Sequence, residues 1–227
     1  DGFNMGCASC SSTTFTAVTT GTPSYYGMST SANNTTCPNN VAFAFEGANA
    51  YHLRNGNVAL TSGSINTCPG ANLTLSFKLA AYSSTDAEGM DDTDYIEVSI
   101  SPDDGVTYYP TARITGNTNV KWLYSATGTA STAYDGDMTA VVFTPSAGGS
   151  TCSLLAGGFS TVQVSNLPAV VGLRIRIRMV NNNDNERWLV DDFKLSSTSA
   201  MFSYCAPAFS SGVEPITNVT FAGINNT

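Results

Sequence analysis

The sequence predicts an all-β fold, a jelly-roll β-sandwich of about ten strands, and three observations support that class. Thr, Ser, Asn and Gly abound while only 11% of the 227 residues are charged, a composition typical of β-proteins with many turns. Apolar and polar residues alternate in several short runs, as they do in half-buried strands. No run of ten residues keeps the i, i+3, i+4, i+7 apolar spacing of a helix.

The strands are expected in short runs between polar turns, with no internal repeat. In chain order the expected strands are 13–19, 41–47, 72–80, the two arms of a hairpin within 94–110, 121–126, 138–145, 160–168, 173–180 and 186–197. An Asp-Gly pair marks the tip of the hairpin. We expect residues 1–40 to be a loop-rich part of the sandwich, 41–200 to form the sandwich itself, and 201–227 to be a linker and an extended strand segment.

Charge and cysteine usage restrict the partners and the compartment. The net charge of −8 and the pI near 4.3 argue against a nucleic-acid partner and leave cations, glycans and proteins. The six cysteines are an even number, which indicates disulfides and export, although six allow 15 pairings. They are Cys7, Cys10, Cys37, Cys68, Cys152 and Cys205. A single C-x-x-C and a single histidine, His52, favour structural disulfides over zinc or redox chemistry. No signal-peptide, membrane-spanning or lipidation motif is found, and we expect a mature, processed, secreted product.

Three arginines alternate with apolar residues in the segment LRIRIRMV. In a strand, Ile175 and its alternate neighbours point inward, while Arg174, Arg176 and Arg178 point outward. Three interpretations remain open for this arginine face. It is a solvated surface that discourages edge pairing, a ladder that binds carboxylates or sulfated sugars, or an interface with a neighbouring domain.

Asp191 stands in an otherwise apolar strand. Alternation in WLVDDFKL predicts that Asp191 shares the core face with Leu189, Phe193 and Leu195, while Asp192 faces the other way. A buried carboxylate is costly unless it is paired or binds a metal. We therefore expect either a structural calcium ion or pairing with backbone amides or Arg187.

An acidic loop is the second candidate calcium site. It carries five carboxylates within nine residues, and like charges at that density repel unless a cation or solvent intervenes. They are Asp86, Glu88, Asp91, Asp92 and Asp94. The spacing is not that of an EF-hand, so a merely solvated loop is the alternative.

The sequence does not predict an enzyme. It lacks the G-x-S-x-G, H-E-x-x-H and phosphate-binding glycine motifs, and His52 follows Tyr51 in a strand-like stretch, where a structural role is expected. Aromatic residues near the predicted turns, Trp122 among them, are candidates for stacking on sugar rings, with core packing as the alternative.

The frame NVAFAFEG … LTLSFKLA … DYIEVSISPDDGVTYY … ERWLVDDFKL resembles the jelly-roll modules of secreted bacterial proteins, which look like MAM-type and reelin-type sandwiches. The resemblance covers roughly residues 41–197, although Val106 stands where those modules usually carry a second glycine. It implies a structural calcium ion near the closing aspartate, here Asp191, with Glu46 of the FEG motif as a second ligand.

The tail YCAPAFSSGVEPITNVTFAGINNT (204–227) resembles the opening of GEVED domains, found in exported Bacteroidetes-type proteins that use type 9 secretion. It implies that residues 201–227 are a linker and the start of a second, GEVED-like domain, or a strand exchanged with a neighbour. Residues 204–227 would then contact a neighbouring domain or subunit. We expect a non-catalytic module of a secreted or cell-surface bacterial protein, acting in adhesion or in binding a surface glycan or protein ligand. Two alternatives are an accessory domain of an exported protease or glycoside hydrolase, and a subunit of an extracellular filament in which an unpaired strand within 216–224 joins a neighbour.

Overall fold

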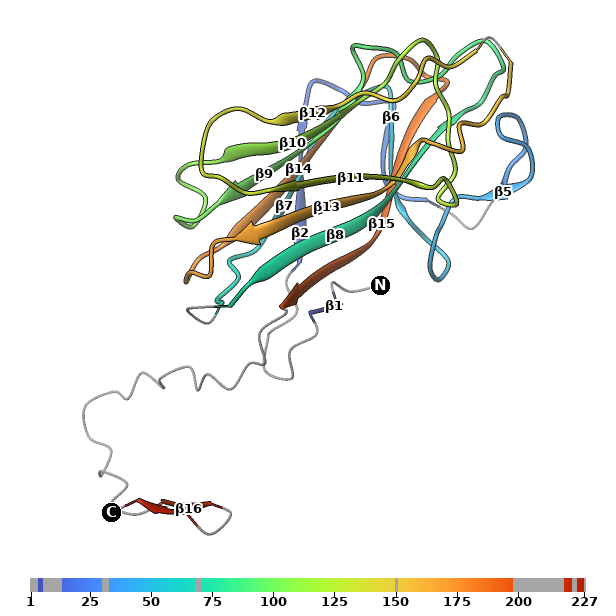
Figure 1. Cartoon of the computed structure of the whole chain (residues 1–227). Helices are drawn as coiled ribbons and strands as arrows, with labels where there is room; N and C mark the ends of the chain where they lie inside the picture. The colour runs from blue at the N-terminus through green and yellow to red at the C-terminus, as the bar shows by residue number, and fades with distance from the viewer. Residues whose placement is uncertain are drawn as a thin grey trace.

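The computed structural model describes residues 4–5, 14–29, 33–67, 71–149, 151–197, 219–221 and 224–226, and every regular element in these ranges is a β-strand. Two sheets stack face to face as a sandwich (Figure 1). The predicted all-β sandwich is therefore confirmed. Within the described ranges, no helix is long and apolar enough to cross a membrane.

The first sheet has seven strands. Its order is β11 (Gly128–Ala133), β13 (Phe159–Leu167), β8 (Leu73–Ser83), β15 (Glu186–Ser197), β6 (Tyr51–Arg54) and β3 (Tyr25–Met28), and β1 (Asn4–Met5) also pairs with β15. The β1–β15 and β11–β13 pairs are parallel, and the other pairs are antiparallel.

The second sheet has six strands and contains the predicted arginine strand near its centre. Its order is β12 (Val141–Phe143), β10 (Tyr109–Thr115), β9 (Tyr95–Ser101), β14 (Arg174–Asn181), β7 (Gly56–Ser62) and β2 (Phe15–Thr20). Only the β10–β12 pair is parallel among these. Two small hairpins stand apart from the sheets: β4 (Asn33–Asn34) with β5 (Val41–Ala42), and β16 (Val219–Phe221) with β17 (Ile224–Asn226).

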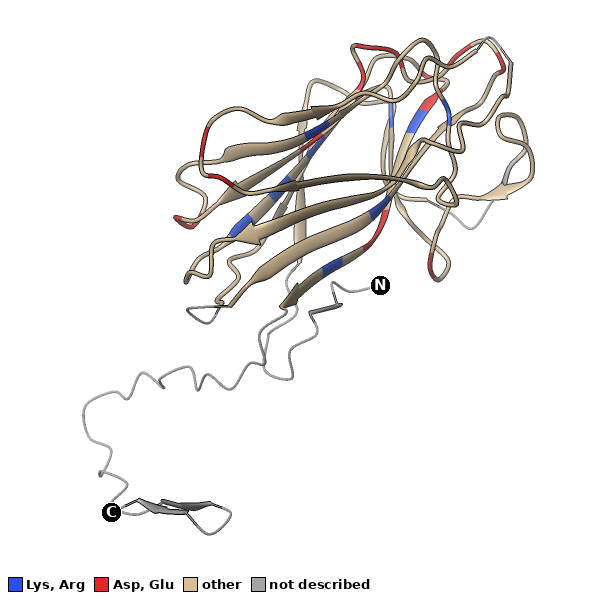
Figure 2. Ribbon diagram, viewed as in Figure 1, with Lys and Arg blue, Asp and Glu red and all other residues tan. Residues whose placement is uncertain are grey.

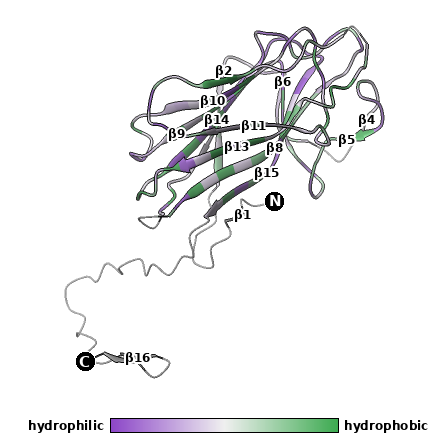
Figure 3. Ribbon diagram, in the orientation of Figure 1, coloured by the Kyte–Doolittle hydropathy of each residue, from purple (hydrophilic) through white to green (hydrophobic). Residues whose placement is uncertain are grey.

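The main core lies between the two sheets. Hydrophobic residues alternate with hydrophilic ones along the strands, so each strand presents one apolar face to the opposite sheet (Figure 3). On β8 the predicted inward residues Leu73, Leu75, Phe77 and Leu79 are all buried, as alternation requires. Burial of such side chains stabilises the fold by about 1.5–3 kcal/mol each.

The predicted strand 41–47 is wrong beyond its first two residues. Only Val41 and Ala42 pair with another strand, and the rest bends over the outer face of the seven-stranded sheet. There Phe43 packs against a second, smaller apolar cluster that includes Tyr82 and Leu189. The alternating phenylalanines therefore cover a sheet instead of belonging to one.

The predicted strand 121–126 is also wrong, because Trp122 forms only an isolated bridge to Ala81. The Trp122 side chain is fully buried, its Nε1–H donates to the carbonyl of Phe159 at 3.1 Å, and its ring contacts Trp188 edge-on. Core packing is the correct interpretation, and Trp122 is excluded from any sugar-binding surface.

A β-bulge in β15 overturns the predicted faces of that strand. Asp191 pairs with Lys78 and Lys194 pairs with Ser76, so β15 holds one more residue than β8 between these pairs. Asp192 takes a positive φ of 50° there, which aspartate tolerates better than most residues. The extra residue reverses the alternation. Asp191 lies with Leu189 on the outer face, whereas Trp188 and Val190 before the bulge and Leu195 after it face the main core.

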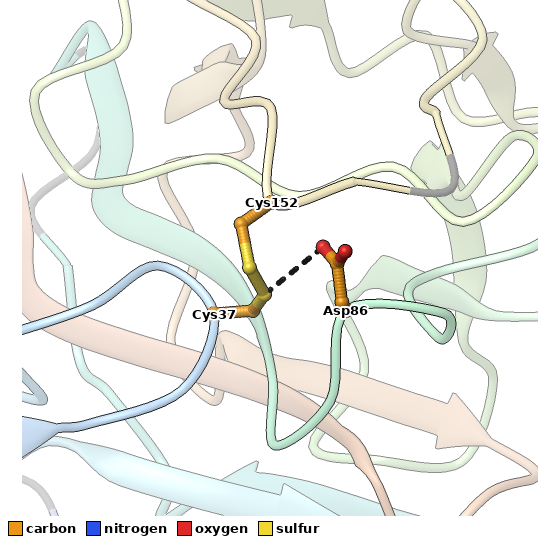
Figure 4. Close-up of side chains that lie close together, drawn as sticks. All are labelled: Cys37, Asp86 and Cys152. Carbon is orange, nitrogen blue, oxygen red and sulfur yellow. Dashed lines mark hydrogen bonds between the residues drawn. A yellow bond between two sulfur atoms is a disulfide. The ribbon is translucent and has the colours of Figure 1, made fainter.

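One disulfide, Cys37–Cys152, is present among the described residues (Figure 4). It joins the loop before β5 to the loop before β13, and the Cα atoms of the two cysteines are 5.2 Å apart. The other four predicted disulfide cysteines lie outside the described residues. The segment predicted as one unpaired strand within 216–224 contributes β16, which pairs with β17 of the same tail.

Candidate functional site

The outer face of the six-stranded sheet gathers four of the six arginines of the chain. Alternation in β14 buries Ile175, Ile177 and Met179 and turns the three arginines of that strand outward, as predicted. The fourth is Arg113 of β10. Figure 2 shows these basic positions as blue segments along the strands, whereas most acidic positions lie in loops and at strand ends. The sheet therefore presents a basic surface on an acidic protein.

Tyrosine rings contact three of these four guanidinium groups. The guanidinium carbon of Arg176 lies 4.1 Å from the ring centroid of Tyr108, and that of Arg113 lies 4.3 Å from the centroid of Tyr95. Arg178 approaches the same Tyr95 ring at 5.8 Å. Such cation–π contacts orient a guanidinium group while leaving its N–H edge free to donate.

Two of the four arginines are already neutralised by carboxylates. Arg113 Nε donates to Glu97 at 3.0 Å, and Arg174 Nε donates to Asp104 of the β9–β10 turn at 2.8 Å. Arg176 and Arg178 are in none of the three ion pairs found in the described part of the chain. Arg178 Nε donates instead to the neutral amide of Asn57 at 3.0 Å.

The neighbours of Arg176 and Arg178 on the β7 side are small, whereas on the β9 side Glu97 lies opposite Arg178. On β7, Thr61 lies opposite Arg176 and Ala59 lies opposite Arg178. On β2, the 59%-exposed Val18 lies opposite Ala59 and continues the same row. These residues form a low shelf beside the two guanidinium groups.

The structure assigns backbone partners to Asp191. Its Oδ2 accepts hydrogen bonds from the amides of Phe45 at 2.8 Å and Glu46 at 3.0 Å, and its Oδ1 accepts from the Asp192 amide at 2.8 Å. Arg187, the other suggested partner, donates to the carbonyl of Asn185. Asp191 is thus paired with backbone amides. Glu46 contributes its backbone amide, whereas its side chain is exposed.

The acidic loop divides into separate environments. Asp86 Oδ1 lies 3.6 Å from the Cys37 sulfur of the disulfide (Figure 4), and the main-chain carbonyl of Asp86 accepts from the buried Lys121 ammonium group at 3.2 Å. Glu88 is half-buried and Asp92 is exposed. Cys37, Cys152 and Asp86 lie close together, but both sulfurs belong to the disulfide, so the three residues do not form a thiolate metal site.

Asp91 and Asp94 meet a third carboxylate that the sequence interpretation missed, Glu186 of β15. One oxygen of each residue lies within 4.8 Å of the others. The available signal was alternation, because Glu186 is in step with the core residues Trp188 and Val190, and a glutamate in that register is expected to be buried. It is 2% exposed.

His52 has the structural role expected of it. Its ring lies 4.9 Å from that of Tyr25. Burial, followed by the charges of Arg187 and Arg54, lowers the pKa of His52 to about 3. The imidazole is therefore neutral at physiological pH.

No protein-family model matches this chain, and no curated protein matches it. Its fold is similar to that of two solved structures. One is the carbohydrate-binding module TmCBM61 in complex with β-1,4-galactotriose, with 12% sequence identity, a TM-score of 0.38 and coverage of 67% of this chain and 72% of that one. The other is the cleaved adhesin domain of Lys-gingipain from Porphyromonas gingivalis, with 16% identity, a TM-score of 0.39 and coverage of 71% and 82%.

Proposed function

We propose that this chain is a non-catalytic module of a secreted or cell-surface bacterial protein, and that it acts in adhesion by binding acidic glycans on the outer face of its six-stranded sheet. The single observation that carries the proposal is the pair Arg176 and Arg178. Both are half-buried, both are oriented by tyrosine rings, and neither is in an ion pair within the described residues.

The spacing of the two arginines suits a repeating anionic ligand. Alternate residues of one strand lie about 6.6 Å apart, so Arg176 and Arg178 present two donor groups in line along β14. A guanidinium group binds carboxylate or sulfate with two parallel hydrogen bonds, which adds direction to charge attraction. A polysaccharide with carboxylates or sulfates along its length can satisfy both groups at once.

The shelf beside the arginines favours an extended sugar chain over a bulky partner. Thr61 supplies a hydroxyl group, Ala59 supplies a low apolar patch, and Val18 extends that patch to the sheet edge. Sugar rings present both hydroxyl edges and C–H faces, so a row of hydroxyl and small apolar groups complements them.

The overall charge makes binding dependent on this face. A protein of net charge −8 repels polyanions, so only a local basic surface can hold one. Attraction at arginines on the protein surface is screened by salt, and we therefore expect affinity to fall as ionic strength rises.

The test is affinity electrophoresis in gels that contain alginate, polygalacturonate or chondroitin sulfate, with neutral dextran as the reference polymer. We expect retardation by at least one acidic polymer and none by dextran. Arg176→Ala and Arg178→Ala should each weaken binding about tenfold, which corresponds to about 1.4 kcal/mol.

The matched control is Lys194→Ala, which removes one positive charge from the other sheet. Lys194 is 49% exposed at its side chain and is paired with Asp192. Equal retardation by dextran, or an equal loss of binding in Lys194→Ala, would overturn the assignment of the arginine face.

A further inference from the structure

Three carboxylates meet at the end of the sandwich where the acidic loop contacts the turn between β14 and β15. Asp91 and Asp94 come from the loop before β9, and Glu186 is the first residue of β15. Asn182 of the turn donates to Thr93 of the loop at 2.6 Å, which holds the two segments together. The cluster therefore depends on residues more than 90 positions apart.

Burial makes it energetically costly for these carboxylates to be charged at the same time. Asp94 is 0% exposed and Glu186 is 2% exposed, while Asp91 is half-buried. None of the three ion pairs in the described part of the chain includes a member of the cluster. Buried like charges destabilise a fold unless a proton or a cation lies between them.

Hydrogen bonds satisfy only some of the carboxylate oxygens of this cluster. Asp94 Oδ2 accepts from the Asp91 amide at 2.9 Å, and Glu186 Oε2 accepts from the Asn183 amide at 3.1 Å. Asp91 Oδ1 accepts from the amide and hydroxyl of Thr93 at 2.8 and 2.6 Å. Asp94 Oδ1, in contrast, is buried and accepts no hydrogen bond. A buried carboxylate oxygen without a donor requires a partner, which is either a proton or a cation.

We propose that Asp91, Asp94 and Glu186 form a binding site for a calcium ion. Two oxygens that bind one calcium ion at about 2.4 Å can be at most about 4.8 Å apart. One oxygen from each of the three residues satisfies that limit. All three are hard carboxylate donors, without the thiolate or imidazole that zinc and copper prefer, and calcium completes its six to eight ligands with carbonyl oxygens and water.

This site does not include Asp191, whose carboxylate oxygens accept hydrogen bonds from three backbone amides. Calcium bound at the site should stabilise the fold. A cation at the cluster joins the acidic loop to the β14–β15 turn, and only the folded chain brings Asp94 and Glu186 together. Calcium should therefore stabilise the folded state, by an amount that rises with the logarithm of its concentration above the Kd.

The experiment uses the whole chain, stripped of metal with a chelator and then titrated with calcium chloride. Bound calcium is counted by atomic emission after equilibrium dialysis, and thermal unfolding is followed in parallel. We expect one ion per chain, a Kd of about 0.1–1 mM, and a rise in Tm of about 4 °C at a calcium concentration about ten times the Kd. Magnesium at the same concentration should give a smaller rise.

Glu186→Gln and Asp94→Asn should each abolish both the bound ion and the rise in Tm. Asp92→Asn is the matched control, because it removes one charge from the same loop at an exposed position and should leave both readouts unchanged.

The alternative is that Asp94 and Glu186 share a proton. In that case the parent chain shows no calcium response, and Glu186→Gln is as stable as the parent or more stable without metal. That result overturns the proposal, as does a full calcium response in Glu186→Gln. Because dialysis counts ions directly, a variant of low stability still gives a decisive reading at low temperature.

Discussion

The Asp191 side chain anchors the segment after β5, which does not pair with a strand. Its carboxylate accepts the amides of Phe45 and Glu46, which are 146 and 145 positions away in sequence. The turn segment that covers the outer face of the seven-stranded sheet is anchored there. The hydroxyls of Tyr82 and Tyr124 also donate to the carbonyls of Ala42 and Phe43, so Asp191 and the second apolar cluster hold this segment together.

Replacement of Asp191 by alanine should lower the free energy of unfolding by about 3 kcal/mol, because it leaves several amides without their charged acceptor. Urea denaturation measures the change. The loss should be the same with and without calcium, since the partners of Asp191 are backbone amides. Asp92→Ala, at an exposed site of the acidic loop, should change the stability by less than about 0.5 kcal/mol.

His52 gives a second prediction at the residue scale. Its pKa falls from 6.5 in the unfolded chain to about 3 in the fold, so the unfolded chain takes up a proton first as the pH drops. The contribution of the neutral His52 ring to the free energy of unfolding is fully present above about pH 6.5. It is lost as the pH falls toward 3, by at most about 1.4 kcal/mol per pH unit. In His52→Gln this part of the slope between pH 6.5 and 4 should disappear. An unchanged slope would contradict the assignment.

Single residues were predictable from alternation only where the strand is regular. Arg174, Arg176 and Arg178 face outward as expected because β14 keeps its register over its whole length. Asp191 was correctly identified as a carboxylate that needs a partner. It was, however, expected on the core face of its strand, and it lies on the outer face of the sheet. The bulge at Asp192 depends on a positive φ that the sequence pattern does not encode.

At the scale of elements, Trp122 in the loop from Lys121 to Ala126 packs closely against the backbone of Gly158. A Cβ atom added at Gly158 would lie 2.3 Å from Cγ of Trp122. The indole ring fills the space beside the glycine backbone and reaches Trp188. The glycine is required here for space.

Gly158→Ala should therefore destabilise the fold by about 2–4 kcal/mol, as overpacking of a rigid core does. Near-ultraviolet circular dichroism should also change, because the chain has only two tryptophans and both contact each other. Gly157→Ala is the matched control, since a Cβ atom at Gly157 meets nothing within 4 Å. Equal effects of the two substitutions would contradict the argument.

The strands that sequence patterns identified well are those buried by the sandwich. The expected strand 186–197 coincides with β15, and 173–180 lies within one residue of β14 at each end. Segment 41–47 was misassigned because its phenylalanines cover the outside of a sheet. Segment 121–126 was misassigned because Trp122 enters the main core from a loop that forms only an isolated bridge. Alternation reports that a segment has an apolar side, and it does not report whether backbone partners are available.

At the scale of the whole molecule, the Cys37–Cys152 disulfide connects loops 115 positions apart in sequence. It holds the covering segment near Phe43 against the sandwich. By restricting the unfolded chain, a crosslink of this span contributes roughly 3–5 kcal/mol. The sequence predicted that disulfides exist, but the pairing depends on which loops meet at the end of the sandwich.

The double variant Cys37→Ser with Cys152→Ser should lose most of that stabilisation and unfold at a Tm lower by about 10 °C. Differential scanning calorimetry measures the shift. The single variants should behave similarly to the double variant, because each removes the same bond. A double variant as stable as the parent would show that the loops are held by packing alone.

The disulfide has a further consequence for a protein exposed to peptidases. The chain between the two cysteines includes the β9–β10 turn, where Val106 is 85% exposed, and the loop before β12, where Met138 is 64% exposed. A peptidase that cuts once in either loop leaves two fragments joined covalently and interleaved in the same sheets. Such a cut nicks the module without releasing either piece, so gel analysis would show cleavage only after reduction.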